Sequence, residues 1–478
     1  MKRMRMLGTI GALVAAAWVA GAMAGFTGQA SAQALLQPVQ YVNPGSTLQQ
    51  IQAAIDNGGT VFFEYGEYNQ LKSTSPGTPN TGKSFNSGKY GNEVHIIGLP
   101  ASDGTRPKIN GGSVPFKIGI FSDFPGLPVN FKIENIEISN PDMAGAGLLY
   151  SRIGIMVLDA LGTQVTINHC KITITGNESD PGHANNYSAA IWFRVLGKSP
   201  PPGGARVHIT NNEIIGSKIN MGIGLGQFWP ETPTFTAPRF FVDNNRISVS
   251  NLRGSGTDSG AITLHGNLSN AVLTNNTITG DARSPGYNKR SSAIIHVDYP
   301  SRPDLYSKKL AVIGNSTSFR DPDSGDLFTF TGDYQLYLGD IVYDSVVVGN
   351  RFESGKAAIA QCSISPGSHN NYFGFDSYGS VLPGGAAAAG VVCHGHDNWF
   401  EDNHFYGDYP GWRPCADGPG LFWFTDTSYN NRVVATKLNG PPYGHDICCQ
   451  VLDETDNPKT PKYDGKNEIP GYDKCRNK

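Results

Sequence analysis

The fold is decided by one short stretch, Ile209-Thr210-Asn211-Asn212-Glu213-Ile214, and by two close copies of it, Val242-Asp243-Asn244-Asn245-Arg246-Ile247 and Leu273-Thr274-Asn275-Asn276-Thr277-Ile278. In each copy an apolar residue and one polar residue precede a polar pair that ends in Asn, and a second apolar residue follows after a one-residue spacer. Apolar and polar residues alternate around the copies, and no 3.6-residue period is sustained. The motif therefore predicts β-strands joined at one repeated structural position.

The second polar position of the motif recurs along most of the chain, at intervals of 21 to 42 residues. We place it at Ile136, Cys170, Asn212, Asn245, Asn276, Asn315, Asn350, Asn371, Asn403 and Asn431. Each unit holds two or three short strands, so stacked turns of three strands predict parallel sheets that run along a coil. The 21-residue interval is taken as close to a minimal coil, and longer units are expected to carry loops along one side.

Backbone chemistry gives a reason for Asn at this position. A sharp bend inside a solenoid turns N–H and C=O groups toward the interior, and stacked Asn amides can bond those groups and one another. Cys170 holds the same position in an earlier coil. We therefore expect its thiol to be buried and unpaired.

Residues 1–32 have the three parts of a secretory signal: basic residues up to Arg5, an apolar run from Leu7 to Ala24, and the cleavage site Ala30-Ser31-Ala32. A membrane anchor is the alternative for this segment. No second apolar run of that length follows, so we expect a secreted or periplasmic protein that does not contact the membrane once the signal is removed.

The charge of the chain argues against a nucleic-acid partner. Loss of residues 1–32 removes three cationic and no acidic residues, which takes the net charge from −3 to −6. Nucleic acids and anionic membranes attract clustered Lys and Arg, which this composition does not offer. The sequence leaves the oligomeric state open.

The ends of the solenoid have distinct sequences. Ser46-Thr47-Leu48-Gln49 fits a capping box, and apolar residues follow it at helical spacing, so we expect a short helix that covers the N-terminal end. The expected β-helix domain, including this cap, spans residues 33–435, and a Cys-containing tail spans 436–478. Six cysteines favour up to three disulfides near that end: Cys362, Cys393, Cys415, Cys448, Cys449 and Cys475.

The pattern resembles the right-handed parallel β-helix proteins of the pectate-lyase-like superfamily. The resemblance rests on Gly45-Ser46-Thr47-Leu48-Gln49-Gln50-Ile51-Gln52-Ala53-Ala54-Ile55-Asp56, on Gly59-Thr60-Val61-Phe62-Phe63, and on the Asn-Asn repeats, and it covers residues 40 to 435. It implies an all-β solenoid of about ten right-handed coils. It does not fix an activity, because the superfamily includes lyases, hydrolases, epimerases, esterases and non-catalytic adhesins.

In catalytic members of that superfamily, the polysaccharide usually lies on the first of the three sheets. Alternation along the corresponding strands turns Trp192 and Arg194 outward, leaves glycine (Gly224 and Gly226) in the next strand, and turns His265 outward in the third. With strands about 4.8 Å apart, Arg194 and His265 would bracket a glycine-floored depression about 10 Å across. Trp192 and Trp229 are candidates to stack on sugar rings.

The following strand, Ala293-Ile294-Ile295-His296-Val297-Asp298, leaves its frame open. In strict register His296 points inward, whereas a shift by one residue turns His296 and Asp298 toward the groove beside His265. The candidate catalytic residues are therefore Arg194, His265, His296 and Asp298.

Three reactions on a polysaccharide compete for this groove. Elimination from a uronate polymer needs a base for the C5 proton and a cation for the carboxylate, which Arg194 and the two histidines supply. Hydrolysis needs two carboxyl groups, and only Asp298 is suitably placed. Epimerisation would use lyase-like residues. We expect a polysaccharide lyase on an acidic glycan, with a glycoside hydrolase and a non-catalytic carbohydrate-binding adhesin as alternatives.

Asp321-Pro322-Asp323-Ser324-Gly325-Asp326 has the spaced carboxylates of a calcium loop, with Gly332 where such a loop needs a bidentate Glu. Asp321, Asp323 and Asp326 are thus candidate Ca²⁺ ligands, and an acidic surface turn is the alternative. No other cofactor is indicated.

Overall fold

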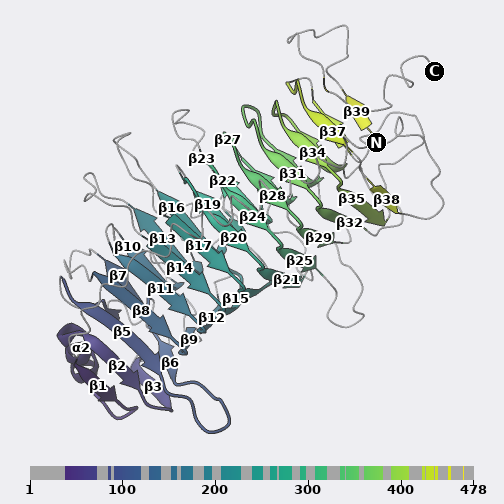
Figure 1. Cartoon of the computed structure of the whole chain (residues 1–478). Coiled ribbons are helices and arrows are strands. Elements are labelled where there is room, and N and C mark those ends of the chain that lie inside the picture. The colour runs from purple at the N-terminus through teal and green to yellow at the C-terminus, as the bar shows by residue number, and fades with distance from the viewer. Residues whose placement is uncertain are drawn as a thin grey trace, which may run out of the picture.

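In the computed structural model, three long parallel sheets wind around one axis as a right-handed parallel β-helix (Figure 1). The structure describes residues 38–72, 84–87, 91–112, 114–119, 129–140, 152–158, 163–175, 188–195, 206–227, 239–250, 259–265, 268–281, 291–297, 307–319, 334–339, 341–354, 360–380, 389–407, 422–425, 427–434, 437–439, 451–453 and 467. Each coil passes through sheet A, then sheet B, then sheet C. The predicted solenoid of three strands per turn is confirmed.

The strands of sheet A, in spatial order, are β1 (Val39–Val42), β2 (Gly59–Phe63), β5 (Glu93–Gly98), β8 (Asn130–Glu134), β11 (Gln164–Asn168), β14 (Arg206–Thr210), β17 (Arg239–Asp243), β20 (Val272–Thr274), β24 (Ala311–Ile313), β28 (Val346–Val348), β31 (Tyr372–Gly374), β34 (Trp399–Glu401) and β37 (Arg432–Val434). Those of sheet B are β3 (Glu67–Leu71), β6 (Lys108–Gly111), β9 (Glu137–Asn140), β12 (Lys171–Thr175), β15 (Glu213–Ser217), β18 (Arg246–Ser250), β21 (Thr277–Asp281), β25 (Ser316–Phe319), β29 (Arg351–Ser354), β32 (Ser377–Ser380), β35 (His404–Gly407) and β38 (Lys437–Asn439).

Sheet C contains β4 (Phe85–Asn86), β7 (Phe116–Gly119), β10 (Arg152–Leu158), β13 (Ser188–Val195), β16 (Met221–Gln227), β19 (Ser259–His265), β22 (Ser291–Val297), β26 (Tyr334–Leu338), β30 (Ala360–Ile364), β33 (Ala389–Cys393), β36 (Phe422–Phe424) and β39 (Val451–Asp453). A small separate sheet joins β23 (Ser307–Lys308) to β27 (Val342–Tyr343). The described strands thus make more turns than the ten that the motif marks, since sheet A alone has 13 strands.

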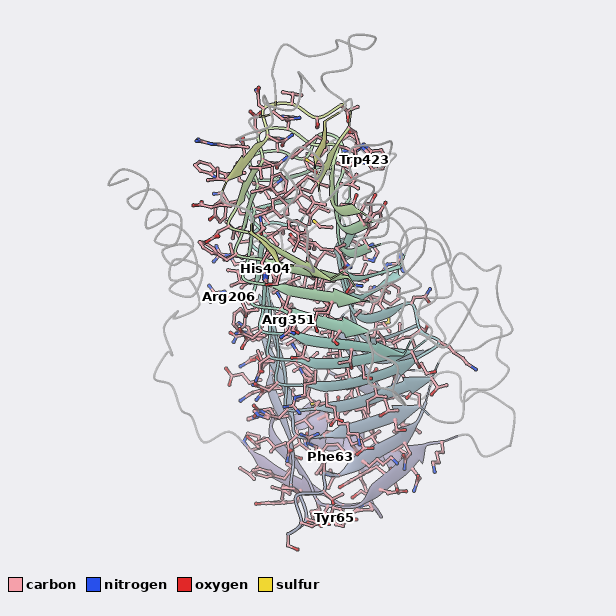
Figure 2. All side chains as sticks on the ribbon, turned by 90° about the vertical axis from the view of Figure 1, so that its right-hand side faces the viewer. Phe63, Tyr65, Arg206, Arg351, His404 and Trp423 are labelled. Atoms are coloured by element: carbon pink, nitrogen blue, oxygen red, sulfur yellow. The ribbon has the colours of Figure 1, made fainter. Side chains whose placement is uncertain are left out.

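The core is the inside of the coil, where one face of every sheet meets the other two. In β14, Val207 and Ile209 are buried while His208 between them lies on the outer face, as strand alternation requires. At the N-terminal end Phe63 is fully buried, whereas Tyr65 in the next turn is 53% exposed (Figure 2). Burial of alternate apolar residues, coil after coil, is the main term that stabilises the fold.

The N-terminal end is covered by the only helix in the described residues, α2 (Leu48–Asn57), which buries Ile51, Ala54 and Ile55 against the core. The predicted capping box is shifted by one residue: Thr47 Oγ1 accepts the N–H of Gln50, and Gln50 Oε1 accepts the N–H of Thr47. Ser46 instead accepts the N–H of Asn43 in the preceding turn. The helix is too short to cross a membrane, and no longer apolar helix occurs in the described ranges.

The Asn motif forms a buried ladder at the bend between sheets A and B. At Asn276, for example, the backbone N–H and the side-chain amide both donate to Asn315 Oδ1, at 3.0 and 2.9 Å, and the amide also donates to the Val242 carbonyl. The residue before each rung adopts a left-handed conformation, with φ 55° at Asn275. Cys170 continues the ladder, fully buried and unpaired as predicted. Its N–H donates to Asn212 Oδ1.

The ten motif positions predicted from the sequence lie along two separate ladders of hydrogen-bonded side chains. Asn371 and Asn431 lie at a different bend, between sheets C and A, where Asn398 links them through 3.0 Å side-chain hydrogen bonds. In the first ladder the rung after Asn350 is Asp376, 26 residues on, and Asn403 follows after 27. The 21-residue interval therefore joins two different bends and is not a minimal coil. Apolar neighbours flank both bends alike, so the sequence alone does not separate them.

The C-terminal segment continues the solenoid in the part that the structure describes. Strands β38 and β39 extend sheets B and C, and Asn467 accepts both the N–H and the side-chain amide of Asn431. Cys362 and Cys393 are free thiols buried in the core, so their predicted place in a disulfide cluster is wrong. Alternation in β30 and β33 turns both side chains into the core. Cys415, Cys448, Cys449 and Cys475 lie outside the described residues.

Candidate functional site

The outer face of sheet C carries five of the predicted site residues in the predicted register: Trp192, Arg194, Gly224, Gly226 and His265. Trp192 in β13 pairs with Gly224 in β16, and Arg194 pairs with Gly226, which in turn pairs with His265 in β19. Arg194, Gly226 and His265 therefore form one line across three strands, with Cα atoms about 4.8 Å apart from one strand to the next. The strand alternation that the sequence predicts is correct in these three coils.

The expected glycine-floored depression is not open beside Trp192. The Trp192 side chain is fully buried and packs in a second apolar cluster, separate from the core, with Met156 and Met221. A Cβ at Gly224 would lie 2.6 Å from Met221 Sδ and 3.1 Å from Trp192 Cδ1. The space above Gly224 is thus filled by these two side chains, and a sugar ring cannot rest on this glycine.

Arg194 and His265 differ in their access to solvent. The Arg194 side chain is half-buried, and its guanidinium carbon lies 5.2 Å from the centroid of the Trp192 ring, within cation–π range. His265 is 0% exposed. A substrate can reach its imidazole only when the residues that cover it give way.

Strand β22 pairs with its neighbours in strict register, the first of the two alternatives predicted for the strand that contains His296. In β22, His296 pairs with Leu264 of β19 and with Leu338 of β26, while Val297 pairs with His265. Leu264 and Leu338 both belong to the core. The shift by one residue that would bring His296 beside His265 is therefore not the one adopted, because Ile294 keeps its place opposite the buried Ile262.

Several predicted site residues lie outside the described residues. They are Asp298, Trp229 and the three candidate calcium ligands Asp321, Asp323 and Asp326. Within the described part of the chain, no group of three or more His, Cys, Asp or Glu side chains is arranged to hold a metal ion.

Two features of this face escaped the sequence reasoning. Tyr337 lies in the same outer column as Trp192, four coils further on, and stacks on Tyr334 with ring centroids 4.9 Å apart. Both tyrosines are half-buried. Buried and outward residues do not alternate strictly in Tyr334-Gln335-Leu336-Tyr337-Leu338, because Gln335 and Leu336 are both buried. The alternation rule therefore does not predict which residues of this strand face outward.

Carboxylates are scarce on this face. Among the strands of sheet C, Asp453 in the last strand is the single acidic residue. The line through Arg194 and His265 is therefore cationic or neutral, which suits an anionic ligand better than a reaction that needs two carboxyl groups.

Comparison with known proteins finds likeness only to solved structures. A surface adhesin of Streptococcus pneumoniae, PfbA, is 13% identical with a TM-score of 0.45, over 89% of this chain and 90% of that one. The A-module of the Azotobacter vinelandii mannuronan C-5 epimerase AlgE6 is 12% identical with a TM-score of 0.40, over 90% and 95%. The periplasmic alginate epimerase AlgG is 10% identical with a TM-score of 0.39, over 86% and 75%.

No protein-family model matches the sequence, and no curated protein matches it. The solved structures have TM-scores below 0.5, so the activities in their names carry no argument for this chain.

Proposed function

We propose that this protein is exported, binds an acidic polysaccharide on the outer face of sheet C, and cleaves it by β-elimination. The observation that carries the proposal is the line of Arg194, Gly226 and His265 across three adjacent strands. It sets one fixed cation and one imidazole about 10 Å apart in Cα position, with no side chain on the residue between them.

Elimination at a uronate residue assigns a role to each group. His265 takes the proton from C5, the C4–O bond breaks, and the electron pair of the C5–H bond forms the C4–C5 double bond, while the leaving oxygen takes a proton from solvent. Negative charge develops on the carboxylate of the sugar before the bond breaks. Arg194 can stabilise that charge through its planar pair of N–H donors.

Hydrolysis at the same place is less well supported. Both stereochemical routes need two carboxyl groups on either side of the glycosidic bond, 5 to about 10 Å apart. The strands around Arg194 and His265 supply none. Carboxylates from other segments would be required.

The test is a panel of uronate polymers, assayed by the ultraviolet absorbance of the unsaturated product. We expect activity on at least one polymer, a loss of 100-fold or more in His265→Ala, and a comparable loss in Arg194→Ala. Arg239→Ala, which removes an exposed cation from sheet A, is the matched control and should retain activity. New reducing ends without absorbance would indicate a hydrolase instead, and silence across the panel would argue against elimination.

A second candidate is a non-catalytic glycan-binding protein, favoured by the complete burial of His265 and Trp192. Buried imidazole and indole groups of this kind can be purely structural. This alternative predicts binding without cleavage, and binding that is unchanged in His265→Ala.

A further inference from the structure

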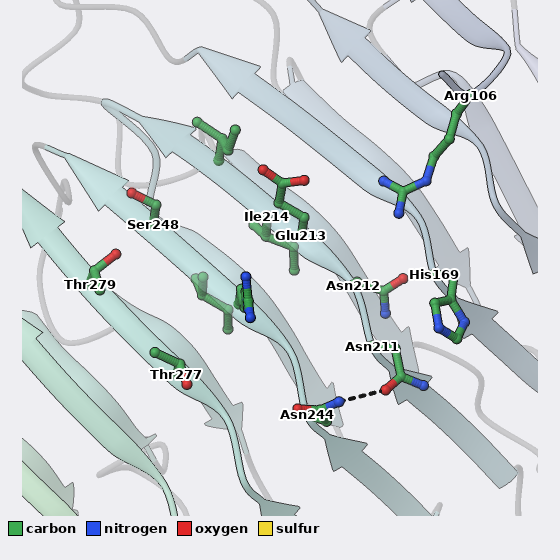
Figure 3. Close-up of a pocket in the computed structure, with 13 residues that line it drawn as sticks. Arg106, His169, Asn211, Asn212, Glu213, Ile214, Asn244, Ser248, Thr277 and Thr279 are labelled. Carbon is green, nitrogen blue, oxygen red and sulfur yellow. Dashed lines mark hydrogen bonds between the residues drawn. The ribbon is translucent and has the colours of Figure 1, made fainter. Parts of the chain in front are cut away.

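A hollow lies away from sheet C, on the outer face of sheet B (Figure 3). Its volume is about 870 Å³, within the range of small-molecule sites. The floor is formed by β15, β18 and β21, and Arg106, from the segment that joins β5 to β6, closes one side. The described residues around the mouth are polar or charged, and most are exposed.

The charges along this face follow an alternating column. Register places Glu67, Lys108, Glu137, Lys171, Glu213 and Arg246 on successive strands of sheet B. The first four form ion pairs: Lys108 with Glu67 at 3.9 Å, and Lys171 with Glu137 at 3.7 Å. Neighbouring opposite charges thus satisfy one another as far as β12.

The pairing stops at the hollow. Glu213 and Arg246 occupy adjacent strands in register, yet no ion pair joins them, and Thr277 follows Arg246 in the column. Arg246 is exposed. Arg106 donates from Nε to the neutral amide of Asn135, at 3.1 Å, which leaves its terminal N–H groups for another acceptor. Two guanidinium groups and one carboxylate therefore line the same hollow without neutralising one another in the described part of the chain.

The remaining lining suits a sugar. Asn211 and Asn244 are joined by a 2.7 Å hydrogen bond and present their amides at the rim (Figure 3). Ser248, Thr277 and Thr279 add hydroxyl groups, and the half-buried Ile215 gives an aliphatic surface between them. Planar amides, a carboxylate and guanidinium groups can bond pairs of ring hydroxyls, and an aliphatic floor can contact C–H groups.

We propose that this hollow is an accessory binding site for a carboxylated sugar residue of an acidic oligosaccharide. Arg246 binds the carboxylate, Glu213 accepts hydrogen bonds from ring hydroxyls, and Arg106, at the far side of the hollow, is available to a neighbouring sugar residue. The inference rests on the proposed function for the class of polymer. It does not depend on cleavage, because the hollow lies on a different sheet from Arg194 and His265.

The test is calorimetric titration of the mature His265→Ala protein with a uronate oligosaccharide, so that turnover does not interfere. Adding Arg246→Gln should weaken binding about tenfold or more, since a charge-assisted hydrogen bond is lost. Arg239→Gln, an equally exposed arginine on sheet A, is the matched control and should leave affinity unchanged. Arg246 forms no ion pair within the described ranges, so this variant is expected to fold normally.

Two further ligands sharpen the result. The same oligosaccharide with its carboxyl groups reduced to alcohols should bind at least tenfold more weakly, and inorganic sulfate should not compete at equal concentration. Equal affinity of Arg246→Gln for the uronate, equal binding of the reduced sugar, or full competition by sulfate would each overturn the proposal. Absence of cleavage by the wild-type protein, with these binding differences intact, would overturn the lyase assignment alone.

Discussion

Asp376 and Asn350 are joined by two hydrogen bonds: the backbone N–H and the side-chain amide of Asn350 both donate to Asp376 Oδ1, at 2.8 and 2.9 Å. Asp376 thus replaces an Asn in the buried ladder and accepts as an Asn would. It has no amide with which to donate onward, as Asn350 does to the Val312 carbonyl. Only the protonated carboxyl supplies a donor in that place.

Protonation of Asp376 should make stability depend on pH. Complete burial raises the pKa of this carboxyl to about 7, against the opposing hydrogen bonds from Asn350 and Tyr378. Between pH 4 and 7 the folded protein holds a proton that the unfolded chain has released, so the free energy of unfolding falls as pH rises through this window. The expected loss is a few kcal/mol, at about 1.4 kcal/mol per unit of pKa difference.

The variant Asp376→Asn isolates this effect. It restores a neutral rung with a donor, so it should be more stable than wild type at pH 8, and the advantage should shrink toward pH 5. Urea unfolding of both proteins from pH 5 to pH 8 measures the difference, and groups common to both cancel. A constant difference across that range would show that Asp376 does not titrate there.

Removal of a regular rung should be costly. Asn276→Ala takes the acceptor from the N–H and side-chain amide of Asn245, both buried, and the donor from the Val242 carbonyl. Unsatisfied buried groups cost about 1 to 3 kcal/mol each, so we expect a loss of about 3 kcal/mol in urea unfolding. Thr277→Ala, at the exposed neighbour, should change stability by less than about 0.5 kcal/mol. Similar small losses in both variants would contradict the structural role of the ladder.

The apolar cluster above sheet C should not tolerate a side chain at Gly224. In Gly224→Ala the new methyl group meets Met221 Sδ and Trp192, and the cost of overpacking is about 1 to 3 kcal/mol. Met221→Ala frees the same space, so the double variant should be more stable than the sum of the single losses predicts. A thermodynamic cycle from urea unfolding measures this coupling. Simple additivity would mean that the two side chains do not share the space.

The three described cysteines should be inert in the folded protein. Burial raises the pKa of Cys170 to about 11 and that of Cys393 to about 12, and it raises the pKa of Cys362 well above its usual value. Because the thiolate is the reactive form, iodoacetamide should label none of them without denaturant and all of them in urea. Peptide mass spectrometry reads out each site. Native labelling, or recovery of Cys362 or Cys393 in a disulfide, would contradict the structure.

The character of the cation at Arg194 gives a prediction on activity. Lys keeps the positive charge and loses the planar fork of donors, so Arg194→Lys should retain more cleavage than Arg194→Ala while remaining at least tenfold below wild type. Initial rates on the best uronate substrate measure the three proteins. Equal activity of the Lys and Ala variants would show that charge at this position does not support the reaction.

Much of the architecture could be predicted from local pattern. Alternation in β13, β16 and β19 gives the correct outward residues, because side chains on a strand point to opposite faces in strict turn. The same rule fails to separate the two Asn ladders. Asn350 and Asn371 stand in alike surroundings, and only the path of the coil shows that one lies between sheets A and B and the other between sheets C and A.

The candidate site, too, could be predicted from the sequence only in part. The sequence places Arg194 and His265 on one face, but it does not show that Met221 and Trp192 fill the space over Gly224 or that His265 is covered. It also gives no sign of the hollow on sheet B, since Arg106 lines it from a coil far earlier in the chain than Glu213 and Arg246.

By itself, the sequence determined a solenoid of stacked three-strand coils with Asn at its bends, because hydrophobic alternation and backbone satisfaction act over a few neighbouring residues. Only the tertiary structure decided which coil each residue stacks on, and therefore which charges pair, which thiols are buried and where a hollow remains. Those properties depend on contacts between residues about 26 to 43 positions apart, and their register is set by the winding of the whole chain.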